Sequence, residues 1–238
     1  MKTVSDLQVK IFADGADKAG MLEMYKQPHI RGFTTNPTLM RKAGISDYEA
    51  FAREILEAIP DRPISLGVLA DDSKEMARQA RKIASWGDNV YVKIPVTNTK
   101  GASTAELVRR LSGENVKLNV TALLPLDQVC EISAALAGGP AAYVSIFAGR
   151  IADTGVDPVP HMSKALDILG NHRNVELIWA SPRELLNIFQ ADAIGCHIIT
   201  VTNDLLQKLL LIGKDLREYS LETVRMFHND AVQSGFAL

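Results

Sequence analysis

The stretch NVYVKIPVTN, residues 89–98, decides how the rest of the sequence is interpreted. Lys93 stands between Val92 and Ile94 in a run of β-branched residues that is typical of a buried strand. A charge in such a strand is costly unless its side chain points into a polar space. Successive side chains of a strand point to opposite faces, so Lys93 shares one face with Tyr91, and the apolar residues take the other.

Seven further strand candidates alternate with amphipathic helical patterns, with no linker or composition shift between them. The eight expected strands are 8–13, 31–35, 63–69, 89–94, 116–121, 142–147, 175–180 and 196–201. Eight strands, each followed by a helix, predict an α/β fold, a single-domain (β/α)8 TIM barrel over residues 1–238. A doubly wound open sheet fits less well, because neither G-x-G-x-x-G nor a P-loop follows a strand. The extra pattern SLETVRMFHNDAVQ predicts a C-terminal helical extension at 220–238.

Composition excludes several classes of partner. The net charge is −2 and basic residues form no run, so nucleic acid is not an expected partner. The apolar stretches fall well short of a membrane span, and the N-terminus shows no signal segment. Cys130 and Cys196 lack the spacing of metal ligands and predict no disulfide framework. We therefore expect a cytoplasmic protein without a membrane or nucleic-acid partner.

Polar residues recur at the ends of the other expected strands on the parity that Lys93 takes. In a barrel one parity faces the lumen and the other faces the helices. The pairs that share the inward parity are Phe12 with Asp14, Thr34 with Asn36, Asn119 with Thr121, Ser145 with Phe147, and Trp179 with Ser181. The sequence therefore predicts a polar site at the C-terminal ends of the strands, where barrel enzymes build their active sites.

Lys93 has two interpretations from parity alone. Partial burial lowers the pKa of a lysine ammonium, which leaves some free amine at neutral pH. A free amine in a polar pocket forms a Schiff base with a carbonyl substrate. Alternatively, Lys93 extends out of the strand end to solvent or pairs with one acid.

Five motifs add a resemblance to a known family. They are GFTTNPTLM, VYVKIPVTN, LNVTALL, YVSIFAGRI and WASPRE, in this order along the chain. Over nearly its whole length the chain resembles the transaldolases, in their short single-domain branch near fructose-6-phosphate aldolase. The resemblance implies a barrel, a Schiff-base (class I) mechanism, and neither a metal nor an organic cofactor. It also implies sugar phosphates as partners, with a dihydroxyacetone unit moving from a ketose phosphate to an aldehyde acceptor.

The resemblance implies catalytic roles for four residues. Lys93 corresponds to the lysine nucleophile of the family. Asp14 corresponds to the base that takes the proton from the hydroxyl whose carbon–carbon bond breaks. Asn36 corresponds to the residue that orients substrate hydroxyls and the intermediate, and Thr121 to the residue that holds the catalytic water. The alternative for Asp14 is a carboxylate that caps a helix or pairs with Lys18.

The resemblance also implies a substrate pocket. Its remaining members are Thr34, Asn119, the hydroxyl-binding Ser145, Phe147, the phosphate-binding Arg150, and the phosphate-contacting Ser181 and Arg183. Arginine forks and a hydroxyl donor suit a phosphate dianion. The alternative for each arginine is a solvated surface charge.

Two positions refine the expected activity. Most relatives carry a glutamate or glutamine on the third strand that positions a water, and this chain has Gly67 there. Either the enzyme is slow or altered, or the vacated volume admits a water or a larger substrate group. Phe147 matches the transfer-type members, whereas aldolase-type members carry a tyrosine that helps to activate water. Phe147 therefore favours transfer over simple aldol cleavage.

Three functions remain open from the sequence. The first is a transaldolase, and the second is a class I aldolase that releases free dihydroxyacetone. The third, left open by Gly67, is a catalytically weakened barrel that only binds a sugar phosphate. The extra helix carries an apolar stripe of Leu221, Val224, Phe227 and Val232, which covers its own barrel or packs on a neighbour. We expect a homo-oligomer.

Overall fold

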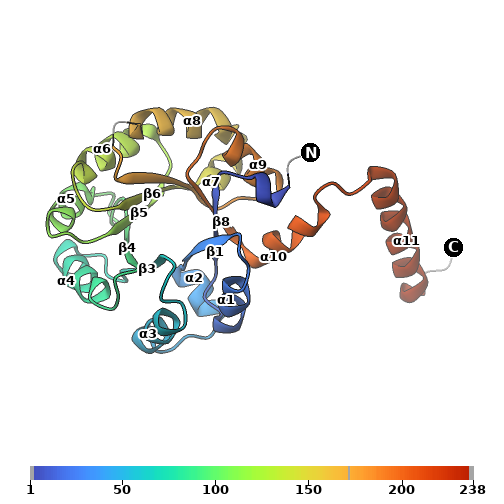
Figure 1. Ribbon diagram of the computed structural model, residues 1–238, viewed down its shortest axis with the longest axis horizontal. Helices are drawn as coiled ribbons and strands as arrows, with labels where there is room; N and C mark the ends of the chain where they lie inside the picture. The colour runs from blue at the N-terminus through green and yellow to red at the C-terminus, as the bar shows by residue number, and fades with distance from the viewer. Residues whose placement is uncertain (1–2, 171, 236–238) are drawn as a thin grey trace.

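Eight parallel strands close into a barrel in a computed structural model that describes residues 3–170 and 172–235 (Figure 1). The strands are β1 Lys10–Asp14, β2 Ile30–Thr34, β3 Ile64–Gly67, β4 Val90–Pro95, β5 Leu118–Leu123, β6 Ala142–Ile146, β7 Val175–Trp179 and β8 Ile198–Thr202. Each strand pairs with the next one in the chain, and β8 pairs with β1. This order confirms the predicted (β/α)8 barrel.

Helices follow every strand, and all but the last of them surround the barrel (Figure 1). They are α1 Lys18–Tyr25, α2 Pro37–Lys42, α3 Tyr48–Ala58, α4 Ser73–Ala84, α5 Ala105–Gly113, α6 Leu126–Leu136, α7 Ala148–Ala152, α8 Pro158–Leu169, α9 Leu186–Ala193, α10 Asn203–Leu206 and α11 Leu216–Ser234. Two short 3-10 helices, η1 Val4–Asp6 and η2 Gln207–Leu211, precede β1 and follow α10. Among the described residues, no helix is both long enough and apolar enough to cross a bilayer.

The apolar core has two layers. The outer layer lies between the strands and the helices, and the inner one fills the lumen. The lumen cluster consists of Phe12, Tyr91, Tyr143, Ile178, Ala180 and Ile198, with Phe147 packed against it. The rings of Tyr91 and Tyr143 are stacked with centroids 4.0 Å apart. Because Tyr91 lies two residues before Lys93 on β4, this cluster forms the floor beneath the polar end of the lumen.

The predicted inward parity is confirmed on β4 and wrong on β7. Trp179 belongs to the outer layer, whereas Ile178 and Ala180 belong to the lumen cluster. Trp179 is fully buried among the apolar side chains of the outer layer, where burial of its large ring is favourable. Ser181 follows the end of β7 with φ +62°, a left-handed conformation in which the alternation of a strand no longer applies. Phe147 was predicted on strand six and lies one residue past the end of β6, at the N-cap position of α7, but its ring packs against the lumen cluster as the inward parity predicts.

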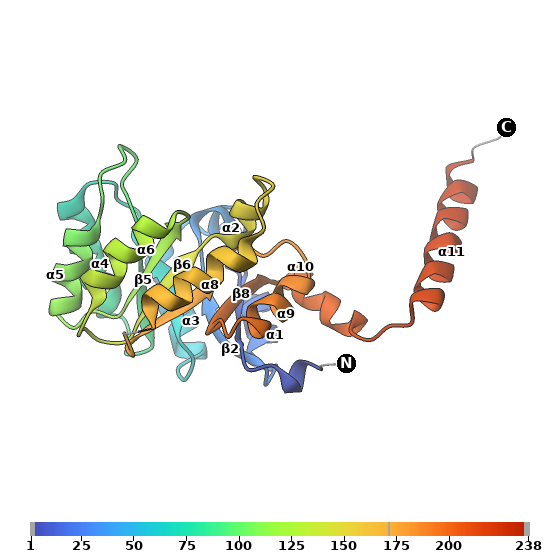
Figure 2. The ribbon, with the colours of Figure 1, turned by 90° about the horizontal axis from the view of Figure 1, so that it is seen from above.

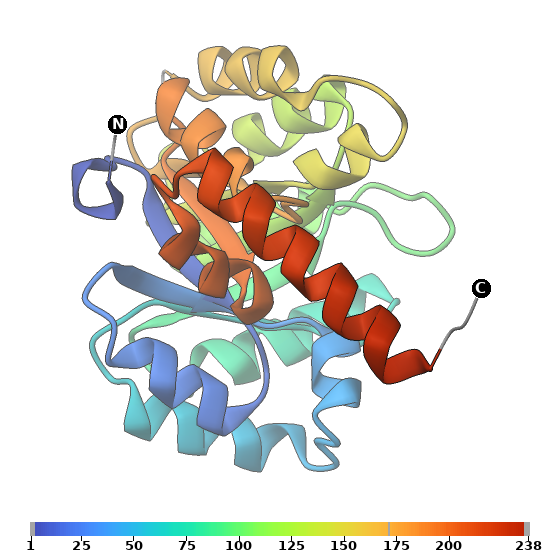
Figure 3. The same cartoon turned by 90° about the vertical axis from the view of Figure 1, so that its right-hand side faces the viewer.

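The predicted extra helix is present as α11 and stands away from the barrel (Figures 1 and 2), so it lies in front of the rest of the chain when seen from that side (Figure 3). It begins at Leu216, four residues before the predicted start, because Asp215 caps its first turn by accepting from Arg217 N and Glu218 N. None of its side chains is buried, and Phe227 is 62% exposed. The last three residues of the predicted extension, 236–238, lie outside the described residues.

Candidate active site

Lys93 points into the polar end of the lumen. On the neighbouring strands, Gly67 of β3 and Asn119 of β5 are its register partners. Its Nζ donates a hydrogen bond of 2.8 Å to the carbonyl of Thr35, at the end of β2. Burial lowers the pKa of the Lys93 ammonium, and the attraction of Asp14 opposes this shift. The lysine therefore holds more free amine near neutral pH than an exposed lysine does.

Asp14 lies at the end of β1 with both carboxylate oxygens held. Thr34 Oγ1 donates to Oδ1 at 2.7 Å, and Asn36 Nδ2 lies 3.3 Å from Oδ2. Burial raises the pKa of Asp14, and Lys93 and these two hydrogen bonds oppose the rise. The alternative interpretation of Asp14 is wrong, because Lys18 pairs with Glu54 and Asp17 caps α1.

The orientation of Asn36 follows from its place at the start of α2. Its Oδ1 accepts from Leu39 N at 2.9 Å, which makes Asn36 the N-cap of the helix, with Pro37 in the first turn. Because the carbonyl oxygen is used by the cap, the amide group Nδ2 points to Asp14. The Asn-Pro pair thus fixes a donor at the edge of the site.

Thr200 is a member of the site that the sequence interpretation missed. It lies buried on β8, and its hydroxyl is 2.5 Å from Thr34 Oγ1. Because the hydroxyl hydrogen of Thr34 is used in the hydrogen bond to Asp14, Thr200 must be the donor in the hydrogen bond between the two threonines. The signal was present in the sequence: β8 neighbours β1 in a closed barrel, and the inward parity of β8 contains Thr200.

A second polar chain crosses the lumen beside Lys93. Asn119 Nδ2 donates to Ser65 Oγ at 2.9 Å, and Ser145 Oγ donates to Asn119 Oδ1 at 2.7 Å. All three side chains are buried, on β5, β3 and β6. The structure therefore joins the predicted Asn119 and Ser145 through hydrogen bonds, and adds Ser65. This chain leaves lone pairs on Ser145 Oγ for a substrate hydroxyl.

Thr121 carries a buried hydroxyl without a partner. Its Oγ1 is shielded from solvent and makes no hydrogen bond to any of the described residues. Thr121 is in register with Pro95, two residues beyond Lys93 on β4. The next residue, Ala122, has φ +67°, and the pairing of β5 with β6 shifts at this point. An unpaired buried hydroxyl costs about 1–3 kcal/mol, so this oxygen favours a water or a substrate atom.

Two of the predicted phosphate-binding residues, Arg183 and Arg150, lie close enough to Asp153 for both to lower its pKa. Arg150 lies on α7, and its guanidinium carbon is 5.7 Å from the centre of the Phe147 ring. Arg183 is already engaged, since its Nε donates to Asp153 Oδ1 at 2.9 Å and its Nη2 contacts Oδ2. The Arg183 guanidinium lowers the pKa of Asp153. Arg150 and Arg183 are both exposed, and the charge of Arg183 is paired with that of Asp153.

Gly67 leaves room for a side chain beside Lys93. A Cβ built on this residue meets only Lys93 Cβ, at 3.7 Å, which is an ordinary van der Waals contact. Tyr48 Oη donates to the carbonyl of Gly67 at 2.9 Å and holds its backbone in place. Packing therefore does not require a glycine here, and the gap beside Lys93 belongs to the site.

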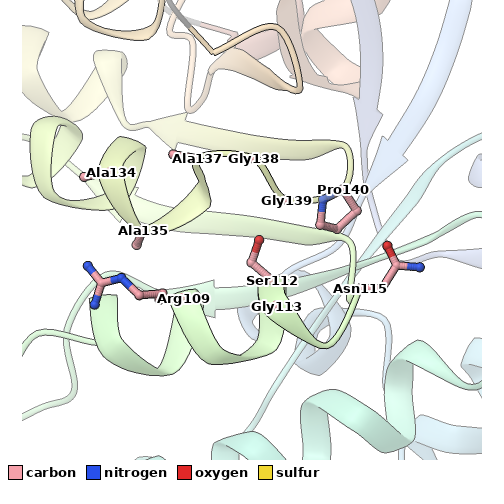
Figure 4. A pocket seen from close by; sticks show the side chains of 10 residues that line it. All are labelled: Arg109, Ser112, Gly113, Asn115, Ala134, Ala135, Ala137, Gly138, Gly139 and Pro140. Atoms are coloured by element: carbon pink, nitrogen blue, oxygen red, sulfur yellow. The ribbon is translucent and has the colours of Figure 1, made fainter.

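Two other cavities lie away from these residues. One of about 580 Å³ is lined by the ends of α5 and α6, with Ser112, Gly113 and Gly139 in its wall (Figure 4). Another of about 450 Å³ is lined by Lys10 and Arg31, near the N-terminal ends of β1 and β2, and by the floor residue Tyr143. Neither contains a predicted site residue.

Comparison with known proteins gives one consistent result for the sequence. A family model described as Transaldolase/Fructose-6-phosphate aldolase matches residues 11–238. The chain is 36% identical over 203 residues to a "Probable transaldolase" of Dehalococcoides mccartyi, which covers 85% of this chain and 90% of the relative. It is 35% identical to a "Probable transaldolase" of Methanococcus maripaludis, with 84% of this chain and 89% of the relative covered.

Solved structures of low identity share the barrel. A 2,3-dimethylmalate lyase superposes with a TM-score of 0.54 at 12% identity, over 98% of this chain and 86% of that one. KGPDC from Streptococcus mutans superposes with a TM-score of 0.56 at 9% identity, over 83% of this chain and 89% of that one. At such identities the likeness concerns the fold alone.

Proposed function

Since the chain belongs to the Transaldolase/Fructose-6-phosphate aldolase family, we propose that it is a class I transaldolase that moves a dihydroxyacetone unit from a ketose phosphate to an aldose phosphate. The observation that carries the proposal is the amine of Lys93 inside the barrel. Burial lowers its pKa, and the carboxylate of Asp14 is close enough to attract it. A reactive amine and a base are the two groups that Schiff-base cleavage of a carbon–carbon bond requires.

The proposed cleavage starts on Lys93. Its free amine adds to the ketone carbon of the donor, and loss of water gives a protonated Schiff base. Asp14 then takes the proton of the hydroxyl on the far side of the bond that breaks. The bonding electrons move to the protonated Schiff base, an enamine remains on Lys93, and the aldehyde product leaves. The raised pKa of Asp14 makes its ionised form a stronger proton acceptor.

The same groups serve the second half of the reaction in reverse. The enamine attacks the acceptor aldehyde, and Asp14 returns the proton to the new hydroxyl. Water then releases the product ketose from Lys93. We propose that Thr121 holds this water, because its hydroxyl is buried without a partner among the described residues. In this proposal Asn36 Nδ2 and Ser145 Oγ bind substrate hydroxyls, and Arg150, Ser181 and Arg183 bind the phosphate, with Arg183 exchanging Asp153 for the phosphate.

Phe147 supports transfer rather than release. Its ring packs against the lumen cluster and brings no hydroxyl to the water near Lys93. The enamine therefore persists until an aldehyde arrives. The test is to incubate the protein with a ketose phosphate, with and without an aldose phosphate acceptor. We expect a borohydride-reducible adduct in both cases and turnover only with the acceptor. Free dihydroxyacetone formed without acceptor indicates the aldolase alternative, and a missing adduct indicates a barrel that only binds.

Gly67→Glu is expected to slow the reaction. The new carboxylate enters the gap beside Lys93, fills space that we assign to a water or a substrate group, and raises the lysine pKa by its charge. The free amine at a fixed pH falls about tenfold for each unit of that rise. Steady-state rates on several ketose phosphates and aldehydes measure the effect.

Gly67→Ala is the matched control, because its methyl group fits at 3.7 Å from Lys93 Cβ and adds no charge. We expect a rate close to that of the wild type. If Gly67 only marked the loss of a catalytic carboxylate, restoring that carboxylate would raise the rate by about 10²–10⁴-fold. A uniform gain for Gly67→Glu across the panel would therefore contradict the role of the gap.

We also propose that α11 packs on a second copy of the chain. Leu221, Val224, Phe227 and Val232 are each at least 47% exposed, and none of the α11 side chains is buried on the barrel of its own chain. Burying an aliphatic or aromatic side chain contributes about 1.5–3 kcal/mol, so a helix face of this composition favours a protein surface over water.

Phe227→Asp is expected to shift the protein to a smaller assembly, since a buried unpaired carboxylate is costly. Gln233→Asp places the same charge on the side of α11 away from this face and should leave the assembly unchanged. Light scattering of the three proteins measures the mass. A monomeric wild type, or an equal mass for wild type and Phe227→Asp, would contradict an interface formed by this face.

A further inference from the structure

The first turn of α7 lies directly against the backbone of Ser181. A Cβ built on Gly149 would lie 1.6 Å from the Ser181 carbonyl oxygen, far below the 3.0 Å that real Cβ atoms keep. Gly149 N also faces the carbonyl of Ala180, at 3.4 Å. A side chain therefore cannot be added to Gly149 unless the segment after β7 moves.

Ser181 itself is held in a disfavoured conformation. Its φ of +62° is left-handed, where a residue with a Cβ is uncommon. Such a conformation persists only where the surroundings hold it. On one side is the close contact with Gly149. On the other, the buried Asn187 Oδ1 accepts from Arg183 N at 2.8 Å and from Glu184 N at 3.1 Å.

Both ends of α7 are attached to this segment. Gly149 in its first turn touches Ser181, and Asp153 at its C-terminal end accepts from Arg183 Nε at 2.9 Å. Arg150 lies between these two attachments and directly follows the glycine. The position of Arg150 relative to Ser181 is thus set by how closely the helix approaches.

We propose that Gly149 is a positioning residue for phosphate binding. It acts by letting α7 approach until Ser181 and Arg150 face the same anion, and it touches neither substrate nor Lys93. The inference rests on the proposed function, in which these two residues bind the phosphate of the sugar. It predicts that a methyl group at Gly149 separates the two phosphate partners and leaves the Schiff-base chemistry intact.

Gly149→Ala is the direct test. The loss of one hydrogen bond to a charged group lowers affinity by about 10–10²-fold. We expect the KM for a ketose phosphate to rise by about that factor. The rate at which borohydride traps unphosphorylated dihydroxyacetone on Lys93 should stay at the wild-type value. Gly113→Ala is the matched control, because its Cβ meets no atom within 4 Å, and it should change neither quantity.

The outcomes separate this inference from the proposed function. A wild type that gives no adduct with either substrate contradicts the function. A wild type that gives the adduct, with an unchanged KM in a folded Gly149→Ala protein, overturns the positioning role alone. A loss of dihydroxyacetone trapping equal to the loss with ketose phosphate also overturns it.

A second pair of variants covers the case in which Gly149→Ala does not fold. Ser181→Gly removes the conformational penalty at φ +62° and lets the carbonyl shift. The double variant Gly149→Ala/Ser181→Gly should then fold and show a higher KM for ketose phosphate than Ser181→Gly alone. Equal KM values for the double and single variants, or a double variant that does not fold, would overturn the proposal.

Discussion

Lys93→Ala is expected to abolish the borohydride-trapped adduct and to lower turnover by about 10⁶-fold, the scale of losing a catalytic nucleophile. The reason is chemical, since no other residue that the structure describes offers an amine beside Asp14 and Thr121. Trapping with a ketose phosphate and steady-state assay of the same preparations measure both losses.

Lys42→Ala is the control for this variant, because Lys42 is an exposed lysine on α2. It should trap and turn over like the wild type. Thermal unfolding establishes that Lys93→Ala is folded, which is expected because the change removes a buried charge and leaves its strand pairing intact. Turnover within tenfold of wild type in Lys93→Ala would contradict the Schiff-base mechanism.

Asp14→Asn is expected to lower kcat by about 10²–10⁴-fold, the range for a general base. The amide keeps the shape of the carboxylate but cannot take the proton that bond cleavage releases. Lys93 remains, so the adduct with a ketose phosphate should still form and accumulate. Single-turnover trapping, compared with the steady-state rate, separates these two steps.

Asp14→Asn is expected to keep or raise the unfolding temperature although it lowers kcat. Burial raises the pKa of Asp14 above its ordinary value, so folding disfavours the ionised form at every pH above that ordinary value. The neutral Asn should therefore unfold at the wild-type temperature or higher at pH 7. Asp17→Asn is the control, since Asn also caps a helix and Asp17 lies exposed at the start of α1. A kcat of Asp14→Asn within threefold of wild type would contradict its role as the base.

The barrel could be predicted because each strand is a short β-branched run, a pattern that can be recognised from neighbouring residues alone. Lys93, Asp14 and Thr121 each stand on the inward parity of a strand end, and a polar residue at that place has few other reasons to occur. The prediction failed where the strand contained no such marker. At β7 the inward residues are the apolar Ile178 and, just past the end of the strand, Ala180, and the large Trp179 packs outward.

The partners of the site residues were harder to predict, because they join distant parts of the chain. Thr200 reaches Thr34 only because β8 closes on β1. The pairing of Arg183 with Asp153 depends on the length of α7, whose five residues give no periodic signal. The left-handed backbone of Ser181 could not be predicted, because serine seldom adopts a positive φ.

The site of the covalent bond tests the central claim most directly. The wild-type protein is incubated with a ketose phosphate, reduced with borohydride, digested and examined by mass spectrometry. The account predicts one modified peptide, with a reduced three-carbon unit on Lys93 and none on the other lysines. A modification at another lysine, or no modification under conditions of turnover, would contradict it.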